Sequence, residues 1–204
     1  MSRMGEAYIN LLNLGRQKSG PLSKKERWAE VVITGKPEGK GRAISGRVTT
    51  KAGRAFVTHR TPRKTMTYEA VIRSAFSSGY PDWQALPESY VFLSVDALYP
   101  PPKKIIARRA SLIKRLEAMK AKELSTGKAV WKTGEVEAIE RELTFQRYCP
   151  VRPDWDNVGK IVCDALNGVA WPDDARVVDA HVEKFYALDG EAPCLRIRIV
   201  ERHI

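Results

Sequence analysis

Four segments of the chain have the composition or the alternation that is typical of β-strands. We predict strands at 28–34, 90–99, 176–186 and 194–200, and the last two alternate apolar and polar residues with a period of two. The residues predicted to face the core are Val178, Ala180 and Val182 in the third strand, and Leu195, Ile197 and Ile199 in the fourth. We therefore expect a half-buried sheet.

Apolar residues that recur every three to four positions predict helices at 65–78, 103–123, 135–147 and 157–166. The helix at 103–123 is basic and the helix at 135–147 is acidic, so we expect these two to form an antiparallel hairpin. The fold class that follows is α+β. It consists of a mixed, roughly four-stranded sheet packed by the helices at 65–78 and 157–166, with a helical insertion at about 103–147.

The length of 204 residues is sufficient for one domain, which we place at 27–204 after a basic N-terminal arm at 1–26. No apolar run reaches the ~18–20 residues that span a bilayer, and the start of the chain lacks the apolar stretch of a signal peptide. The three cysteines, Cys149, Cys163 and Cys194, do not have the spacing of a zinc site or a disulfide framework. We therefore expect a cytoplasmic protein with reduced thiols and no membrane contact.

Lysine and arginine outnumber aspartate and glutamate by 35 to 24, which gives a net charge of +11. The excess is concentrated at 36–64, where Glu38 is the only acidic residue, and 47–57 within it is predicted to be a β-hairpin with Gly53 in its turn. This region is either a solvated loop or a surface that binds a nucleic-acid backbone, and the concentration of charge favours the second interpretation. The residues predicted to bind DNA are Lys36, Lys40, Arg42, Arg47, Lys51, Arg54, Arg63 and Lys64.

Two acidic residues stand at the start of the predicted helix at 157–166. Asp154 and Asp156 are one residue apart, so in extended backbone both carboxylates point the same way. Asp156 is then expected to be the N-cap of the helix. Two interpretations are open: an ordinary capped turn, or a pair of ligands for one hard cation such as Mg²⁺.

Further charged residues follow on this helix and after it. Lys160 and Asp164 lie on the face opposite the apolar stripe, where they could form an ordinary ion pair, and Asp173 and Asp174 precede the strand at 176–186. Several carboxylates and one lysine at the ends of elements, in a basic chain, favour a divalent-metal site. Such a site can hydrolyse a phosphodiester, because the ion activates water and neutralises the phosphate while a lysine stabilises developing charge.

The stretch that holds these residues resembles the signature of the RusA family of Holliday junction resolvases. The matching residues are Arg152-Pro153-Asp154-Trp155-Asp156-Asn157, Lys160, Asp164-Ala165-Leu166-Asn167-Gly168 and Asp173-Asp174-Ala175-Arg176-Val177-Val178. The resemblance implies a homodimeric, magnesium-dependent endodeoxyribonuclease that resolves four-way DNA junctions by paired phosphodiester cleavage, with Mn²⁺ as a substitute for Mg²⁺. It assigns metal binding and catalysis to Asp154, Asp156 and Asp174, and a catalytic role to Lys160.

Two further acidic residues have looser parallels in the family. Asp164 occupies a position that is usually acidic and would support the metal ligands, and Asp173 would assist the carboxylate that follows it or form the turn. The region at 35–63 resembles the basic N-terminal loop of the family. The arm at 1–26 and the segment at 103–147 are additions to the family pattern, and they affect the expected substrate preference and dimer geometry rather than the chemistry.

Three alternatives remain open from the sequence. The chain could be a nuclease for flaps or other branched DNA, a non-catalytic DNA-binding module, or a protein–protein module with a structural cation site. A binding module leaves the acidic cluster unexplained, because carboxylates repel phosphate. The protein–protein module leaves the basic region unexplained.

Overall fold

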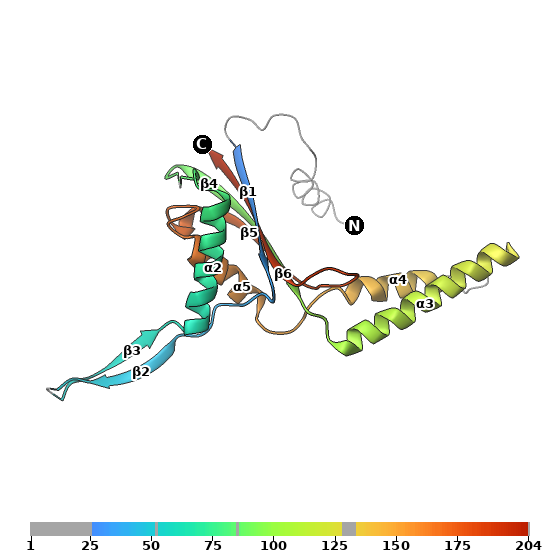
Figure 1. The fold of residues 1–204 in the computed structure, drawn as a ribbon, viewed down its shortest axis with the longest axis horizontal. Helices are drawn as coiled ribbons and strands as arrows, with labels where there is room; N and C mark the ends of the chain where they lie inside the picture. The colour runs from blue at the N-terminus through green and yellow to red at the C-terminus, as the bar shows by residue number, and fades with distance from the viewer. Residues whose placement is uncertain (1–25, 52, 85, 128–133, 204) are drawn as a thin grey trace.

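The computed structural model describes residues 26–51, 53–84, 86–127 and 134–203, so the predicted basic arm lies outside the described residues except for Glu26 (Figure 1). In chain order the elements are β1 (Glu26–Thr34), β2 (Ile44–Thr49), β3 (Ala55–Arg60), α2 (Arg63–Gly79), β4 (Ser89–Tyr99), α3 (Lys103–Thr126), α4 (Glu135–Phe145), α5 (Trp155–Leu166), the 3₁₀ helix η1 (Asp174–Arg176), β5 (Val177–Tyr186) and β6 (Cys194–His203). Among the described helices, none is both long and apolar enough to cross a membrane.

Four strands form one mixed sheet in the order β1-β6-β4-β5. Strands β1 and β4 both pair antiparallel with β6, whereas β5 pairs parallel with β4. Parallel pairing requires a crossover connection, and the chain between β4 and β5 contains α3, α4 and α5. The predicted α+β class with a mixed four-stranded sheet is confirmed.

Helices α2 and α5 pack against one face of this sheet (Figure 1). The apolar stripe of α5 is completely buried, as predicted: Val158, Ile161, Val162, Ala165 and Leu166. Each of the larger of these side chains contributes roughly 1.5–3 kcal/mol through its removal from water. Because α5 is anchored along its whole length, the polar residues on its other face are held in fixed positions.

Strand β5 departs from the predicted alternation. The ladder pairs Val177 with Val91 and then skips Val178, which forms a β-bulge. As a result Val177 and Val182 pack against the core, whereas Val178 is 51% exposed and Ala180 is exposed as well. The prediction that Val178 and Ala180 are buried was therefore wrong. Val178 is the extra residue of the bulge, and Ala180 pairs with the buried Leu93 but is exposed because β5 is the edge strand.

Strand β6 follows the prediction. Leu195, Ile197 and Ile199 are buried against the helices. Arg198 lies on the open face of the sheet, where it pairs with Glu30 at 2.9 Å and with Asp96 at 3.1 Å. The charged residues of neighbouring strands thus balance one another on this face.

Two hairpins project from the body in different directions (Figure 1). One is the two-stranded sheet β2–β3, with Gly53 at φ +78° in its turn. The other consists of α3 and α4, which run antiparallel around a small cluster of Leu112, Met119 and Ile139. Both hairpins were predicted from the sequence, and both are confirmed.

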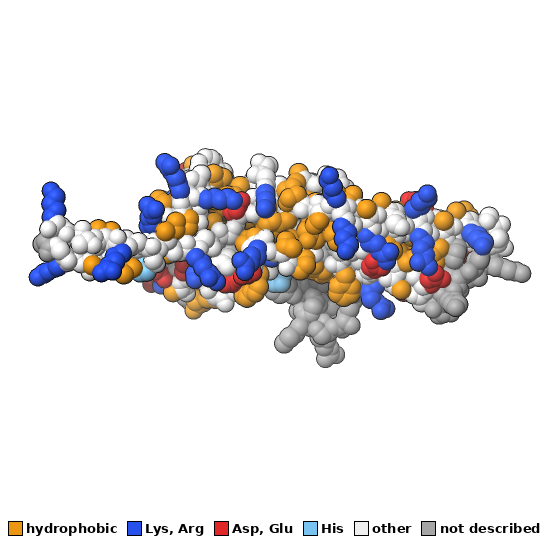
Figure 2. All heavy atoms as spheres, turned by 90° about the horizontal axis from the view of Figure 1, so that it is seen from below, with side chains coloured by type: hydrophobic (Ala, Val, Ile, Leu, Met, Phe, Trp, Pro, Cys, Tyr) orange, Lys and Arg blue, Asp and Glu red, His pale blue; other side chains and the backbone are white. Residues whose placement is uncertain are grey.

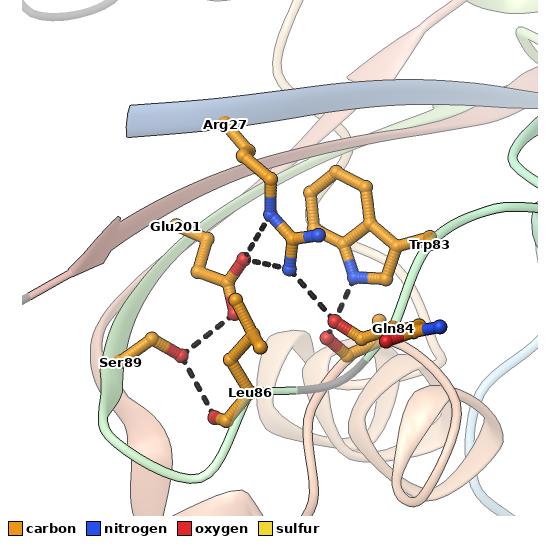
Figure 3. A network of polar contacts seen from close by, with 7 residues as sticks. Arg27, Trp83, Gln84, Leu86, Ser89 and Glu201 are labelled. Carbon is orange, nitrogen blue, oxygen red and sulfur yellow. Dashed lines mark hydrogen bonds and ion pairs between the residues drawn. The ribbon is translucent and has the colours of Figure 1, made fainter. Parts of the chain in front are cut away.

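A buried polar network closes one end of the sheet (Figure 3). Glu201 is fully buried and accepts hydrogen bonds from Nε of Arg27 at 2.6 Å and from the hydroxyl of Ser89 at 2.7 Å. Arg27 also donates to the carbonyl of Gln84 at 2.8 Å and lies 4.3 Å from the ring centroid of Trp83. The network joins β1, β4 and β6 to the loop that follows α2.

Candidate active site and nucleic-acid interface

The acidic pair lies at the start of α5, and both side chains are exposed. Asp154 has extended backbone (φ −68°, ψ 153°), and its carbonyl already accepts the N–H of Val158 at 3.2 Å. The N-cap is therefore Asp154 and not Asp156, contrary to the prediction, and Asp156 lies in the first helical turn. The side chain of Asp154 makes no hydrogen bond to the helix end, so its carboxylate is available to an external group.

The basic loop after β1 runs against the start of α5. The backbone N–H of Lys40 donates to the carbonyl of Asn157 at 2.8 Å. A Cβ at Gly39 would lie 2.5 Å from the Cβ of Pro153, and one at Gly41 would also collide with a neighbour, so only glycine permits this approach. The two charged regions that are far apart in sequence are thus side by side. The glycines that flank Lys40 were the sequence signal for this contact.

The side chain of Lys40 turns inward rather than toward a ligand. Its Nζ lies 2.5 Å from a carboxylate oxygen of Asp164 and 2.6 Å from one of Glu69 on α2. Burial lowers the pKa of the Lys40 ammonium, but the two carboxylates, Asp164 foremost, outweigh it, so the pKa lies above its ordinary value of 10.5. Lys40 therefore ties the loop to both helices, and Asp164 pairs with it rather than with Lys160. No spacing pattern along the chain indicates Glu69 as a partner of Lys40.

Lys40→Met is expected to lower the free energy of unfolding by about 1–2 kcal/mol, between the values for exposed and buried ion pairs, because two carboxylates lose their shared cation. Since the folded pKa is raised, this stabilisation is fully present below the unfolded pKa of about 10.4 and is lost as pH rises through the folded pKa. Urea unfolding of both proteins between pH 7 and 11 measures it.

The difference between wild type and Lys40→Met should be constant to about pH 10 and shrink above it. Lys64→Met is the control, because its ammonium is largely exposed in its 2.9 Å pair with Glu38, and it should cost less than about 1 kcal/mol. Equal losses in the two variants, or a difference that grows with pH, would contradict the role given to Lys40.

Lys160 lies one helical turn after Asp156, on the exposed side of α5. Residues four apart on a helix lie on the same side of it, so Lys160 and Asp156 face the same side of α5. Lys160 forms no ion pair with another residue in the described ranges. It is therefore available to contact a phosphate that approaches the acidic pair.

The second acidic pair lies just before β5. Asp173 accepts the backbone N–H two residues on at 2.9 Å, which makes it a turn residue at the start of η1. Asp174 accepts the indole N–H of the fully buried Trp171 at 3.1 Å. The pKa of the Cys163 thiol is raised to about 11, first by burial and then by the charges of Asp174 and Asp164, so Asp174 lies near this part of α5.

The acidic residues are not gathered into a finished metal site. Within the described ranges, no three side chains of His, Cys, Asp or Glu are placed to hold one ion together. Carboxylate oxygens are the ligands that Mg²⁺ prefers. However, Asp154 and Asp156 lie at the start of α5, whereas Asp174 lies in η1 and bonds to Trp171. The metal-binding role of the three carboxylates stays a prediction.

Three of the basic residues predicted to bind DNA line a shallow groove of about 450 Å³ between the loop and α2: Lys36, Arg63 and Lys64. Tyr68 and Glu38 complete its wall, and Glu38 forms the ion pair with Lys64. The groove adjoins the loop segment that contacts α5. An anion in it would therefore lie beside the loop that packs against the start of α5.

The remaining basic residues of this region are carried outward by the β2–β3 hairpin. Arg47, Lys51 and Arg54 are exposed on it, and of the eight predicted DNA-binding residues only Lys40 is not exposed. Seen from below, lysine and arginine side chains spread along the molecule from this hairpin to the helical one, with acidic side chains in places among them (Figure 2). This face offers a long cationic surface to a polyanion.

The family model described as "Endodeoxyribonuclease RusA" matches residues 34–200, which is most of the chain. The matched range includes β4, β5 and most of β6, both projecting hairpins and the acidic residues of α5 and η1, whereas β1 reaches it only with Thr34. A search of curated proteins found no match. The chain belongs to the RusA endodeoxyribonuclease family.

Proposed function

We propose that this protein is a magnesium-dependent, structure-specific endodeoxyribonuclease that resolves four-way DNA junctions by paired cleavage. The observation that supports it best is the arrangement at the start of α5, where Asp154 and Asp156 are exposed, Lys160 lies one turn away, and Gly39 brings the basic loop against them. Carboxylates beside a path for phosphates would repel the ligand. A cation held between carboxylate and phosphate accounts for their placement.

In this proposal Asp154, Asp156 and Asp174 hold the divalent cation, Mg²⁺ or Mn²⁺. The bound ion supplies an activated water and neutralises charge on the phosphate. Lys160 contacts a phosphate oxygen and stabilises the negative charge that develops on it. Asp154 and Asp156 gain from their position at a helix N-terminus, where the dipole of α5 favours the charged carboxylates.

Two further residues position this group without touching DNA. Asp164 holds Lys40, which fixes the loop against the start of α5. Asp173 closes the turn that presents Asp174. Replacement of Asp164 should weaken catalysis because Lys40 would no longer be held in place, and replacement of Asp173 because Asp174 would no longer be held.

Paired cleavage needs two active sites on one junction, and we propose that a homodimer supplies them. A two-fold symmetric dimer places identical sites on the two-fold related strands of a junction. We also propose a cytoplasmic setting, consistent with three cysteines that form no disulfide.

The test is incubation of the protein with a synthetic four-way junction and with a linear duplex of the same sequence, in Mg²⁺, in Mn²⁺ and in EDTA. We expect symmetric cuts in two strands of the junction, dependent on the metal, and no cuts in the duplex. Sedimentation should give the mass of a dimer. Preferred cleavage of flaps would assign another branched-DNA specificity, and tight binding without cleavage in either metal would leave a DNA-binding module.

Removal of three arginines from the basic region should flatten the salt dependence of junction binding. Arg42, Arg47 and Arg54 are exposed, and each phosphate contact contributes about 0.9 to the slope of log K against log salt, so the triple alanine variant should lose about 2–3 units. Fluorescence anisotropy in EDTA measures binding without cleavage. An unchanged slope would mean that these residues face solvent in the complex.

A further inference from the structure

The α3–α4 hairpin forms a separate arm with its own core, and the acidic site makes no use of it (Figure 1). Arg108 pairs with Glu142 at 2.7 Å, and Arg115 pairs with Glu135. These ion pairs lock the two helices in antiparallel order. The arm is thus a structured projection rather than a loose loop.

The base of the arm is fixed to the sheet. Arg109, only 12% exposed, donates to the carbonyl of Leu143 at 2.6 Å and to Asp189 in the β5–β6 turn at 3.1 Å. Arg147 pairs with Glu191 in the same turn at 3.0 Å. Because α3 and the segment that follows α4 are both tied to this turn, the arm projects in a defined direction.

The unpaired lysines of α3 lie mostly on one side of the helix. The arginines described above serve ion pairs, whereas Lys103, Lys104, Lys114, Lys120 and Lys122 are exposed and form no ion pair with another described residue. At 100° per residue all of these lysines except Lys120 fall within a sector of about 100°, and the buried Leu112 lies outside it. We call this sector the lysine face.

The lysine face is shaped for close approach to a flat or convex partner. Small, exposed residues stand between its lysines: Ala107, Ser111, Ala118 and Ala121. Both glutamates of α3, Glu117 and Glu123, lie outside the sector. A solvated helix face commonly mixes charges of both signs, so a row of lysines among small side chains favours a polyanionic partner.

The dimensions suit a DNA duplex. From Lys103 to Lys122 the helix rises about 28 Å at 1.5 Å per residue, which equals about eight base pairs at 3.4 Å. The nine residues 146–154 join α4 to α5 and span at most about 30 Å, so the arm begins within that distance of the acidic pair. Figure 2, turned about the horizontal axis of Figure 1, shows basic side chains on one face of the molecule both over the β2–β3 hairpin and over the α3–α4 arm.

We propose that the lysine face of α3 binds the phosphate backbone of one duplex arm of the substrate, away from the strand-exchange point. This inference rests on the proposed function, since it assigns to the helical arm a part of the same DNA. The β2–β3 hairpin and the helical arm then contact the junction on two sides of the acidic residues. The partner is recognised by charge and shape, so the contact carries no sequence preference.

The test compares two double variants that each remove two positive charges from the arm. Lys114→Ala/Lys122→Ala empties part of the lysine face, whereas Lys120→Ala/Arg141→Ala removes exposed charges from other sides of the same arm. Alanine preserves the helices, and thermal melts verify that both variants fold like wild type. Binding to a four-way junction is measured in EDTA as a function of salt, with duplex arms of about 8 and about 20 base pairs.

We expect Lys114→Ala/Lys122→Ala to lower the slope of log K against log salt by about 1.8. Wild type should bind junctions with the longer arms more tightly than those with the shorter arms, and this variant should lose most of that gain in affinity. The control variant should retain both the slope and the gain. Cleavage at saturating protein should be the same in all three proteins. If wild type cuts the junction but the two double variants bind alike, the inference is wrong and the proposed function stands. If wild type neither binds nor cuts junctions in preference to duplex, the proposed function fails. The lysine face is still supported in that case if Lys114→Ala/Lys122→Ala, but not the control variant, lowers the salt slope of binding to linear duplex.

Discussion

Asp156→Asn is expected to slow junction cleavage by roughly 10²–10³-fold, while the affinity for the junction in EDTA stays equal or rises. The substitution keeps the shape of the side chain and removes one charge from the exposed pair at the start of α5. Deletion of one preorganised electrostatic group in an active site costs about this much in rate. Binding should not suffer, because one repulsion of the phosphates has gone. Single-turnover cleavage at saturating protein and anisotropy in EDTA separate the two effects.

Asp82→Asn provides the matched control, because Asp82 is an exposed carboxylate in the turn after α2. It changes the net charge equally and should alter neither rate nor affinity. Asp174→Asn distinguishes two roles for a residue that accepts a hydrogen bond from Trp171. If Asp174 holds the metal, the rate falls as for Asp156→Asn. If it only braces Trp171, the melting temperature falls and the rate is nearly unchanged. An Asp156→Asn protein that cleaves like wild type would refute the assignment of the acidic pair.

The elements around the site could be predicted because their patterns leave one way to bury apolar surface. The stripe of α5 recurs at helical spacing, and only one face of the helix can then be buried, so Lys160 and Asp164 had to lie on the other side. The same reasoning predicted α3 and α4, where opposite charges on neighbouring helices also gave their pairing. Local periodicity therefore determined which residues lie outside the core and available for chemistry.

Contacts between distant segments could not be predicted in this way. The bulge at Val178 depends on the register with β4, which no periodicity within β5 records. Lys40 was counted with the exposed basic residues, because its two acidic partners, Glu69 and Asp164, come from separate helices. The spacing of Asp154 and Asp156 suggested convergence in extended backbone, but the helix begins between them. Charge and spacing identified the groups, and tertiary packing decided which way each side chain points.

Arg27→Met is expected to lower the free energy of unfolding by about 3 kcal/mol, the lower end of the range for removal of one partner of a buried ion pair. Glu201 is fully buried, and the variant leaves its carboxylate with Ser89 as its hydrogen-bond donor. The Arg27 side chain is 31% exposed. Replacement of the other partner, Glu201→Gln, should therefore lower the free energy of unfolding by less, because Arg27 can still reach water. At 2–4 °C per kcal/mol for a chain of this size, the melting temperature should fall by roughly 6–12 °C.

The control for Arg27→Met is Arg198→Met on the open face of the same sheet. Its pairs with Glu30 and Asp96 are partly exposed, so its loss should be below about 1 kcal/mol. Because Arg27→Met also removes the contact with Trp83, a second variant is needed to identify the cause. In Arg27→Met/Glu201→Met the buried charge is gone as well, and apolar replacement of a whole buried pair is often neutral or stabilising. The double variant should therefore recover most of the lost stability in urea unfolding. A double variant less stable than Arg27→Met would show that the stacking on Trp83 and the bond to Gln84, rather than an uncompensated carboxylate, account for the effect.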